Sequence, residues 1–175
     1  LDQHEITIFA AAPGVFRKIL TDETVLKLPK LRHALSAGEK MPDRLQKAWR
    51  ATTGCPVYEA FGMSECWTFI SASPAHPARP GTLGRPQTGR RVAIVDADGP
   101  VAVGTQGMIA VSRHDQGLML GYRHENGALR RLVADEWFVT GDQGTMVQDG
   151  QIESCGPAAD IMTAGVYRVC LLPRI

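Results

Sequence analysis

The sequence predicts an α/β protein in which a partial doubly wound sheet is followed by a small β-barrel-like subdomain. In residues 1–69, short apolar runs alternate with stretches of helical periodicity, an order that is typical of parallel sheets. Residues 71–89 are rich in proline, glycine, serine and alanine, which indicates a long connection between two parts. Beyond residue 91, short apolar runs separated by turn residues predict a β region with little helix.

Two helices and three strands are expected in the first part. One helix opens at Pro13, because proline suits the first turn, and the other runs from Met41 to Gly54, because glycine favours helix ends. The expected strands occupy residues 6–9, 31–35 and 56–60. Ligands collect at the carboxyl ends of strands in such sheets, so a binding site is expected at residues 36–38 and 61–65.

The second part is expected to contain several short strands. They cover residues 92–95, 107–111, 137–140, 144–147 and 151–152. Asp149 and Gly150, between the last two runs, are a strong signal for a hairpin turn. From these breaks we predict an α/β subdomain at residues 1–78, a small β subdomain at residues 79–155 and a final segment at residues 156–175.

Composition and charge favour small-molecule chemistry. The chain has 175 residues, of which 44% are hydrophobic, enough for one domain with a core or for two small ones. Nineteen basic and eighteen acidic residues give a formal net charge of +1, so we expect neither nucleic acid nor an anionic membrane as a partner. No apolar run approaches the roughly 20 residues that span a bilayer, and no leader-like segment is evident, so a cytoplasmic location is expected.

The cysteines and basic pairs have ordinary structural interpretations. The four cysteines show no C-x-x-C pairing, so we expect reduced and mostly buried thiols instead of a zinc site. They are Cys55, Cys66, Cys155 and Cys170. Arg90 and Arg91 are expected to be solvated, and the five histidines show no ligand spacing.

Two short motifs give the strongest functional signal. Residues 58–65 read Tyr-Glu-Ala-Phe-Gly-Met-Ser-Glu, and residues 136–142 read Glu-Trp-Phe-Val-Thr-Gly-Asp. In order and residue type they resemble two signature motifs of the adenylate-forming (AMP-binding) superfamily, in its acyl-CoA synthetase branch. Residues 35–39, 80–86 and 156–162 also resemble family segments, so the resemblance runs through nearly the whole chain.

The resemblance implies the fold of the family's large N-terminal domain and an acid-thiol ligase that forms acyl-AMP from ATP and transfers the acyl group to CoA. It gives Phe61 a ring against adenine and Asp142 a carboxylate for the ribose. It makes Ser64, facing phosphate, and Glu65, facing Mg²⁺, the catalytic pair. The implied nucleotide and acyl contacts are Ala37, Gly38, Glu39, Glu59, Ala60, Phe61, Gly62, Met63, Ser64 and Asp142.

The implied ligands fit these residue types. The expected partners are a small carboxylic acid, ATP with Mg²⁺, and CoA. Mg²⁺ prefers one or two carboxylates beside phosphate oxygens and waters, so Glu65 next to the Ser64 hydroxyl is sufficient. Met63 and Trp67 indicate a hydrophobic acid.

Each motif also has a structural interpretation. Residues 61–65 can be a strand end that runs into a helix capped by Ser64, and Thr-Gly-Asp at residues 140–142 is a common turn. The small residues at 36–38 suit a tight loop as well as a pocket. Glu59 can face solvent or line the pocket.

The chain departs from the family at the hinge motif. Where the family has an arginine, a charged pivot and often a lysine, this chain has Pro157, Ala159 and Thr163. The family's phosphate loop and its lysine-bearing C-terminal domain are expected outside this sequence, so we expect no acyl-adenylate formation by the chain alone. The alternative is a truncated, catalytically silent relative that acts at most as a nucleotide-binding or interaction module.

Overall fold

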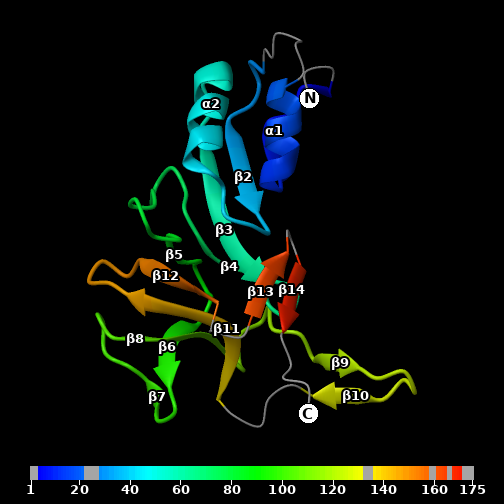
Figure 1. The fold of residues 1–175 in the computed structure, drawn as a ribbon, viewed down its shortest axis with the longest axis vertical. Helices are drawn as coiled ribbons and strands as arrows, with labels where there is room; N and C mark the ends of the chain where they lie inside the picture. The colour runs from blue at the N-terminus through cyan, green and yellow to red at the C-terminus, as the bar shows by residue number, and fades with distance from the viewer. Residues whose placement is uncertain (1–3, 22–27, 132–135, 158–160, 165–166, 171–175) are drawn as a thin grey trace.

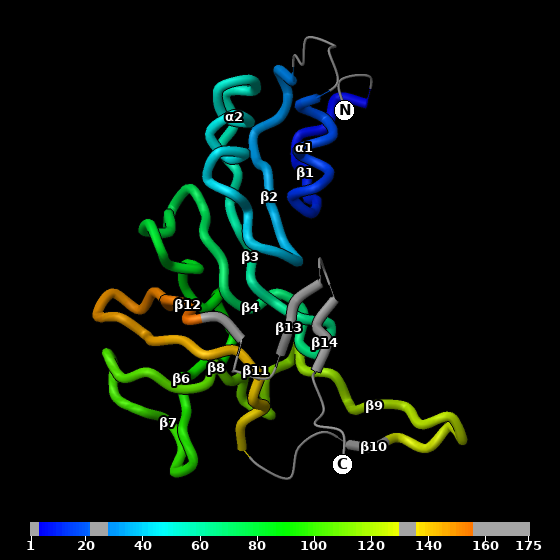
Figure 2. The backbone as a smooth tube through the Cα atoms, viewed as in Figure 1, coloured from blue at the N-terminus to red at the C-terminus, as the bar shows by residue number. Residues whose placement is uncertain are grey.

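Two five-stranded sheets organise the chain (Figure 1 and Figure 2). The structure is a computed structural model that describes residues 4–21, 28–131, 136–157, 161–164 and 167–170. The first sheet and both helices form the upper part of Figure 1, and the second sheet lies below them. The predicted fold class, an α/β part followed by a β part, is therefore confirmed.

The first sheet has the strand order β1-β2-β3-β4-β5. Its elements are β1 (Ile8–Ala11), α1 (Pro13–Thr21), β2 (His33–Ala37), α2 (Asp43–Thr53), β3 (Val57–Met63), β4 (Trp67–Ser71) and β5 (Arg85–Pro86). Strands β1, β2 and β3 are parallel and are connected through the helices, whereas β4 and β5 are antiparallel additions. The parallel strands begin one or two residues later than the sequence predicts, and β4 was not predicted at all.

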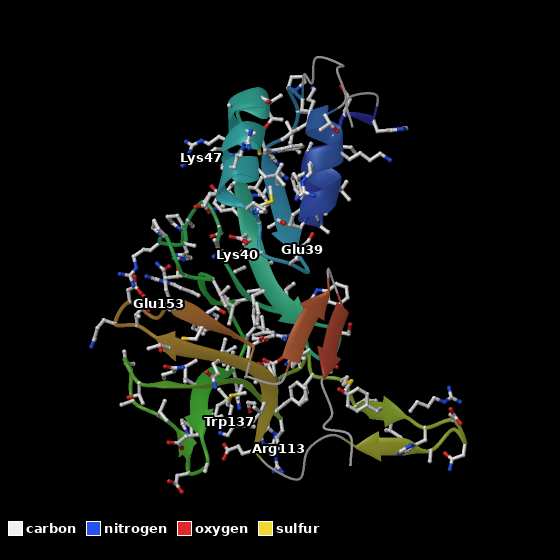
Figure 3. All side chains as sticks on the ribbon, in the orientation of Figure 1. Glu39, Lys40, Lys47, Arg113, Trp137 and Glu153 are labelled. Carbon is white, nitrogen blue, oxygen red and sulfur yellow. The ribbon has the colours of Figure 1, made fainter. Side chains whose placement is uncertain are left out.

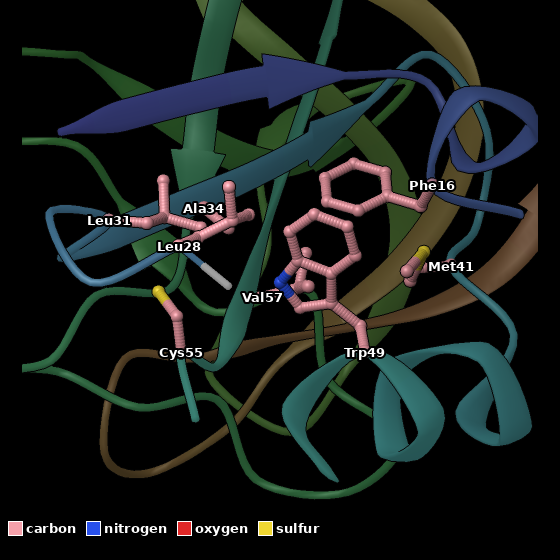
Figure 4. Packing of buried hydrophobic residues seen from close by; sticks show 8 residues of the cluster. All are labelled: Phe16, Leu28, Leu31, Ala34, Met41, Trp49, Cys55 and Val57. Carbon is pink, nitrogen blue, oxygen red and sulfur yellow. The ribbon is translucent and has the colours of Figure 1, made fainter. Parts of the chain in front are cut away.

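Both helices pack on the same face of the parallel strands. The ring of Phe16 from α1 meets the indole of Trp49 from α2 edge-on, with ring centroids 4.8 Å apart. Phe9 of β1 contacts both rings, at 5.2 Å and 6.0 Å. Figure 4 shows Trp49 reaching from α2 toward Phe16 and Val57 in this core. In the described residues, helices therefore cover one face of the parallel strands, whereas a complete doubly wound sheet has helices on both faces.

Helix α2 ends as the sequence predicts. Gly54 follows it with a left-handed φ of 73°, and its N–H donates to the carbonyl of Arg50 at 2.9 Å. That geometry closes the last turn and directs the chain into β3. The helix begins at Asp43, two residues after the predicted start.

The second sheet is open, with the strand order β12-β11-β8-β6-β7. Its strands are β6 (Val92–Asp96), β7 (Gly99–Pro100), β8 (Gln106–Ser112), β11 (Trp137–Met146) and β12 (Ile152–Pro157). All the pairings are antiparallel, and β12 does not pair with β7 in the described residues, so no closed barrel forms there. The runs at 137–140 and 144–147 belong to one long strand, and the hairpin turn at Asp149 and Gly150 is confirmed.

Two further hairpins complete the described elements. One joins β9 (Gly121–Arg123) to β10 (Leu129–Arg131), and the other joins β13 (Ile161–Ala164) to β14 (Tyr167–Cys170). The first projects away from both sheets in Figure 1. Neither hairpin was predicted from the sequence.

A shared core joins the two sheets. Phe69 and Ile70 of β4 pack with Ile109 of β8 and Ile152 of β12, all fully buried. The backbone adds two hydrogen bonds, from the Leu83 N–H to the Ile152 carbonyl at 2.8 Å and from the Ile152 N–H to the Gly84 carbonyl at 2.9 Å. Part of the predicted connection at residues 71–89 therefore belongs to this junction. The division into subdomains at residues 78 and 155 stays a prediction.

Candidate nucleotide site

The predicted phosphate-facing residues occupy a tight turn between β3 and β4. Phe61, Gly62 and Met63 end β3, and residues 64–66 form the turn, which the Cys66 N–H closes on the Met63 carbonyl at 3.2 Å. The chain continues into β4, so the interpretation of Ser64 as a helix cap is wrong. Its hydroxyl lies on an exposed residue at the carboxyl end of β3, the edge where ligands bind in such sheets.

Close packing of the backbone requires a glycine at position 62, in addition to the ligand contact predicted for this residue. A Cβ atom at this position would lie 2.5 Å from the Thr68 Cα and would also collide with the Trp67 carbonyl. The β3–β4 pairing has a bulge at this point, which brings the two backbones together. The neighbouring Phe61 packs edge-on against Phe69 at 5.4 Å, so its ring is partly engaged by the core. Its contact with adenine stays a prediction.

Glu65 is held by the segment that follows β8. Its carboxylate Oε1 accepts a hydrogen bond from the Tyr122 hydroxyl at 2.8 Å, and its carbonyl accepts one from the Met119 N–H at 2.7 Å. The other carboxylate oxygen, Oε2, accepts no hydrogen bond from the part of the chain that the structure describes. The carboxylate is therefore fixed at one oxygen and open at the other.

A nearly buried ion pair supports the same turn. The Arg90 guanidinium donates to the Cys66 carbonyl and pairs with Asp115 at 3.0 Å, and the two side chains are 14% and 1% exposed. Asp115 also accepts hydrogen bonds from the N–H groups of Arg91 at 3.0 Å and Gly117 at 2.8 Å. The expectation that Arg90 is solvated is wrong, because its charge is compensated inside the protein.

The three cysteines whose side chains the structure describes are free thiols. Cys55 and Cys66 are buried and Cys155 is exposed, whereas the side chain of Cys170 lies outside the described residues. Burial raises the pKa of the Cys66 thiol to about 12, and burial also raises the pKa of Cys55. These thiols stay protonated at neutral pH, which agrees with the structural role predicted for the buried cysteines.

The loop after β2 lies beside the same strand end. Ala37 pairs with Ala60 across β2 and β3, Gly38 follows with a φ of 94°, and Glu39 is exposed. Figure 3 shows Glu39 and Lys40 at the lower end of β2. These positions are compatible with the predicted contact between this loop and a bound nucleotide or acyl group.

Glu59 connects this loop to β3. Its Oε1 accepts a hydrogen bond from the Met41 N–H at 2.7 Å. Burial raises the pKa of the Glu59 carboxyl, and the Met41 hydrogen bond opposes that rise. The side chain is half-buried against the segment before α2, which excludes the solvent-facing interpretation. Its contact with a ligand stays a prediction.

Asp142 lies in an irregular section of β11. Val139 pairs with Ala110 and Gln143 with Met108, so three residues of β11 face a single residue of β8. Such a bulge redirects side chains and is frequent near functional sites. The Thr140 hydroxyl donates to the Ile109 carbonyl at 2.8 Å and accepts from the Asp142 N–H at 3.2 Å. Asp142 is only 3% exposed, and β12 places Pro157 opposite it.

The structure thus brings together some of the predicted residues. Register joins the β2 loop to β3, and the β3–β4 turn follows directly. Asp142 belongs to the second sheet, and Ile109, which faces its bulge, is in the core shared with β4. Four residues that support the turn were not predicted from the sequence, because they lie far from that turn along the chain. They are Tyr122, Met119, Arg90 and Asp115.

The site fits a magnesium ion bound mainly by nucleotide. The described residues contain no group of three or more His, Cys, Asp or Glu side chains that could hold a metal ion on its own. Mg²⁺ bound to ATP needs only one or two protein carboxylates, because phosphates and waters supply the other ligands. Glu65, with one carboxylate oxygen open, fits that requirement, and its contact with Mg²⁺ stays a prediction.

Comparison with known proteins identifies the family. The model of the AMP-binding enzyme family matches residues 1–123. This chain belongs to that family. Human mitochondrial acyl-coenzyme A synthetase ACSM3 is 29% identical over 174 residues, which cover 97% of this chain and 30% of ACSM3. 3-Hydroxybenzoate–CoA ligase from Aromatoleum sp. (strain CIB) is 30% identical over 166 residues, which cover 93% of this chain and 31% of the ligase.

A solved structure gives the same result for this AMP-binding family member. The anthranilate CoA ligase AuaEII, in complex with anthranoyl-AMP, matches with a TM-score of 0.74 and 30% identity. The match covers 97% of this chain and 33% of AuaEII. The chain therefore spans about a third of the length of the relatives it matches. Among the described residues, no helix is long and apolar enough to cross a membrane, and the cytoplasmic location stays a prediction.

Proposed function

We propose that this chain forms part of the nucleotide- and acyl-binding surface of an ATP-dependent acyl- or aryl-CoA synthetase. The observation that supports the proposal is the Glu65 carboxylate, fixed at one oxygen in a turn at the carboxyl end of β3 and preceded by the exposed hydroxyl of Ser64. The similarity to a ligase solved with anthranoyl-AMP also supports it. An aromatic or other hydrophobic acid is the favoured substrate class.

The proposed reaction has two steps. A carboxylate oxygen of the acid attacks the α-phosphorus of ATP, and the bond from that phosphorus to the pyrophosphate oxygen breaks. The CoA thiol then loses its proton and attacks the acyl carbon, and AMP leaves. The protein aligns the groups, compensates phosphate charge and excludes water. Mg²⁺ that enters with ATP adds positive charge at the phosphates.

We assign the predicted roles to this geometry. Glu65 faces the metal, Ser64 the phosphate and Asp142 the ribose. Phe61 contributes its ring to adenine. The remaining wall is formed by Ala37, Gly38, Glu39, Glu59, Ala60, Gly62 and Met63.

A second candidate function rests on Pro157. This proline replaces the hinge arginine expected from the family and pairs with Asp142 between β11 and β12. A proline supplies neither a charge nor a backbone N–H beside the predicted ribose carboxylate. The alternative is therefore a nucleotide-binding module without turnover. Pyrophosphate release in the presence of ATP, Mg²⁺, CoA and a panel of aryl and short-chain acids distinguishes the two.

Magnesium-dependent nucleotide binding is the direct test. ATP should be titrated into the chain by calorimetry, with Mg²⁺ and with a chelator. Glu65→Gln should remove the gain in affinity that Mg²⁺ gives and leave the melting temperature unchanged. The matched control is Glu153→Gln, the same change at an exposed residue of β12, which should bind as the native chain does. Equal magnesium dependence in all three proteins would contradict the proposal.

The ribose assignment needs a separate comparison. Asp142→Ala removes a charge-assisted hydrogen bond to a hydroxyl, worth about 1.5–3 kcal/mol, so ATP affinity should fall by roughly tenfold or more. Tripolyphosphate has no ribose, and its affinity should not change. Equal losses for both ligands would show that Asp142 is needed for the bulge and not for the ribose.

A further inference from the structure

We propose that Tyr122 is a positioning residue for the Glu65 carboxylate, and that the segment at residues 115–122 holds the metal-facing turn of the nucleotide site. This inference rests on the proposed function. It assigns a task to a segment of the β part that the motifs at residues 58–65 and 136–142 do not include. The contacts that support it join the two sheets.

The segment makes two hydrogen bonds to a single residue of the turn, Glu65. Tyr122 donates to the Glu65 carboxylate, and the Met119 N–H donates to the Glu65 carbonyl. One bond fixes the backbone and the other fixes the side chain. A carboxylate held at both points has few rotamers left, so its open oxygen keeps a constant direction.

The start of the segment is anchored by the ion pair. Asp115 binds the Arg90 guanidinium, which in turn donates to the Cys66 carbonyl, one residue beyond Glu65. Gly117 lies close to this pair, and a Cβ atom there would collide with the Arg90 guanidinium. The segment and the turn are therefore fixed to each other at both ends.

The exposure of the two side chains suits a ligand-facing role. Tyr122 is 41% exposed, Glu65 is partly exposed, and the hydrogen bond between them is open to solvent. A bond in this position contributes little to the stability of the fold. Its effect is on the orientation of the carboxylate, as with the outer hydrogen bonds that orient metal ligands.

The test measures metal affinity directly. Free Mn²⁺ should be followed by electron paramagnetic resonance while the chain and ATP are titrated, so that the readout does not depend on turnover. Tyr122→Phe removes only the hydroxyl and should weaken Mn²⁺ binding by about tenfold, the lower end of the effect of outer-ligand mutations. ATP binding in chelator and the melting temperature should not change. Leu120→Ala, at an 83% exposed neighbour in the same segment, is the control and should match the native chain.

A double variant separates positioning from a general effect. In the Glu65→Gln background, Tyr122→Phe should cause no additional loss, because the group that it orients is gone. If Glu65→Gln weakens Mn²⁺ binding but Tyr122→Phe does not, the positioning role is overturned and the proposed function stands. If Glu65→Gln also has no effect, both are overturned.

Discussion

The two loops of the candidate site are held in place in different ways. The loop after β2 is fixed from within its own sheet, because the Met41 N–H donates to Glu59 of the neighbouring strand. The turn after β3 is fixed from the second sheet, through Arg90, Met119 and Tyr122. The first loop therefore depends on the α/β core alone, whereas the second depends on the contact between the two sheets.

This difference separates the two tasks proposed for the site. The loop after β2 is a wall for adenine or the acyl group, and its shape is set locally. The turn after β3 presents the metal-facing carboxylate, and its shape is set by residues that are 24 to 57 positions away in the chain. A substitution in the second sheet should thus affect the metal side of the site more than the adenine side.

The largest expected effect comes from removing Arg90. Arg90→Ala leaves Asp115 as an uncompensated buried charge, which typically costs about 3–5 kcal/mol. The free energy of unfolding in urea should fall by this amount. Arg79→Ala is the matched control, because its ion pair with Asp149 is exposed and should contribute less than about 1 kcal/mol. Equal losses in the two variants would show that the turn does not depend on the buried pair.

Gly62→Ala should have the next largest effect. The added methyl group collides with the backbone of β4, and overpacking of this kind costs about 1–3 kcal/mol. Gly14→Ala provides the opposite control. No atom lies within 4 Å of a Cβ atom at this position in α1, so alanine should stabilise the helix by about 0.5–1 kcal/mol. Thermal unfolding of the two variants should show shifts of opposite sign.

Ser36→Ala should stabilise the strand that leads into the β2 loop. The Ser36 hydroxyl is buried and makes no hydrogen bond in the described residues, so its removal should raise the free energy of unfolding by about 1 kcal/mol. Thr140→Ala should lower the free energy of unfolding, because the Thr140 hydroxyl donates a hydrogen bond to the Ile109 carbonyl. A loss of stability in Ser36→Ala would mean that a partner for this hydroxyl exists.

The smallest expected effect is the pH dependence of the free energy of unfolding that Glu59 causes. Because the pKa of Glu59 is raised in the folded state, its contribution to stability is present below the ordinary value of 4.5 and is lost as the pH rises through the folded pKa. Glu59→Gln keeps an acceptor for the Met41 N–H and has no charge to bury. The native chain should therefore lose stability relative to this variant as the pH rises above 4.5 and through the raised pKa of Glu59. Glu39→Gln, at an exposed residue of the same loop, is the control, and an identical trend there would exclude burial as the cause.

Local signals in the sequence predicted the fold where they were strong. Pro13 and Gly54 marked the correct ends of α1 and α2, since their backbone preferences do not depend on tertiary contacts. Strand β4 was missed, because it follows a three-residue turn without a glycine or proline to mark it. The β9–β10 hairpin was missed as well, since its short strands have no clear alternation.

The site was predictable only in part, for a similar reason. The motif at residues 58–65 located the strand end and its turn, because a run of consecutive residues forms both. The support from Tyr122 and Arg90 depends on how the two sheets pack, which a single sequence does not reveal. The bulge at Asp142 was anticipated only as a turn, since its offset against β8 is a property of the pairing.

Chemical labelling of Cys66 can report when the turn after β3 opens. Alkylating reagents react with the thiolate, and this thiol is fully buried with a pKa raised to about 12. In a chain whose Cys55, Cys155 and Cys170 are replaced by serine, the label can reach Cys66 only when the turn opens. The labelling rate then measures the free energy of that local opening, separately from global unfolding. The residue beside Glu65 is thus a built-in probe of how firmly the second sheet holds the site.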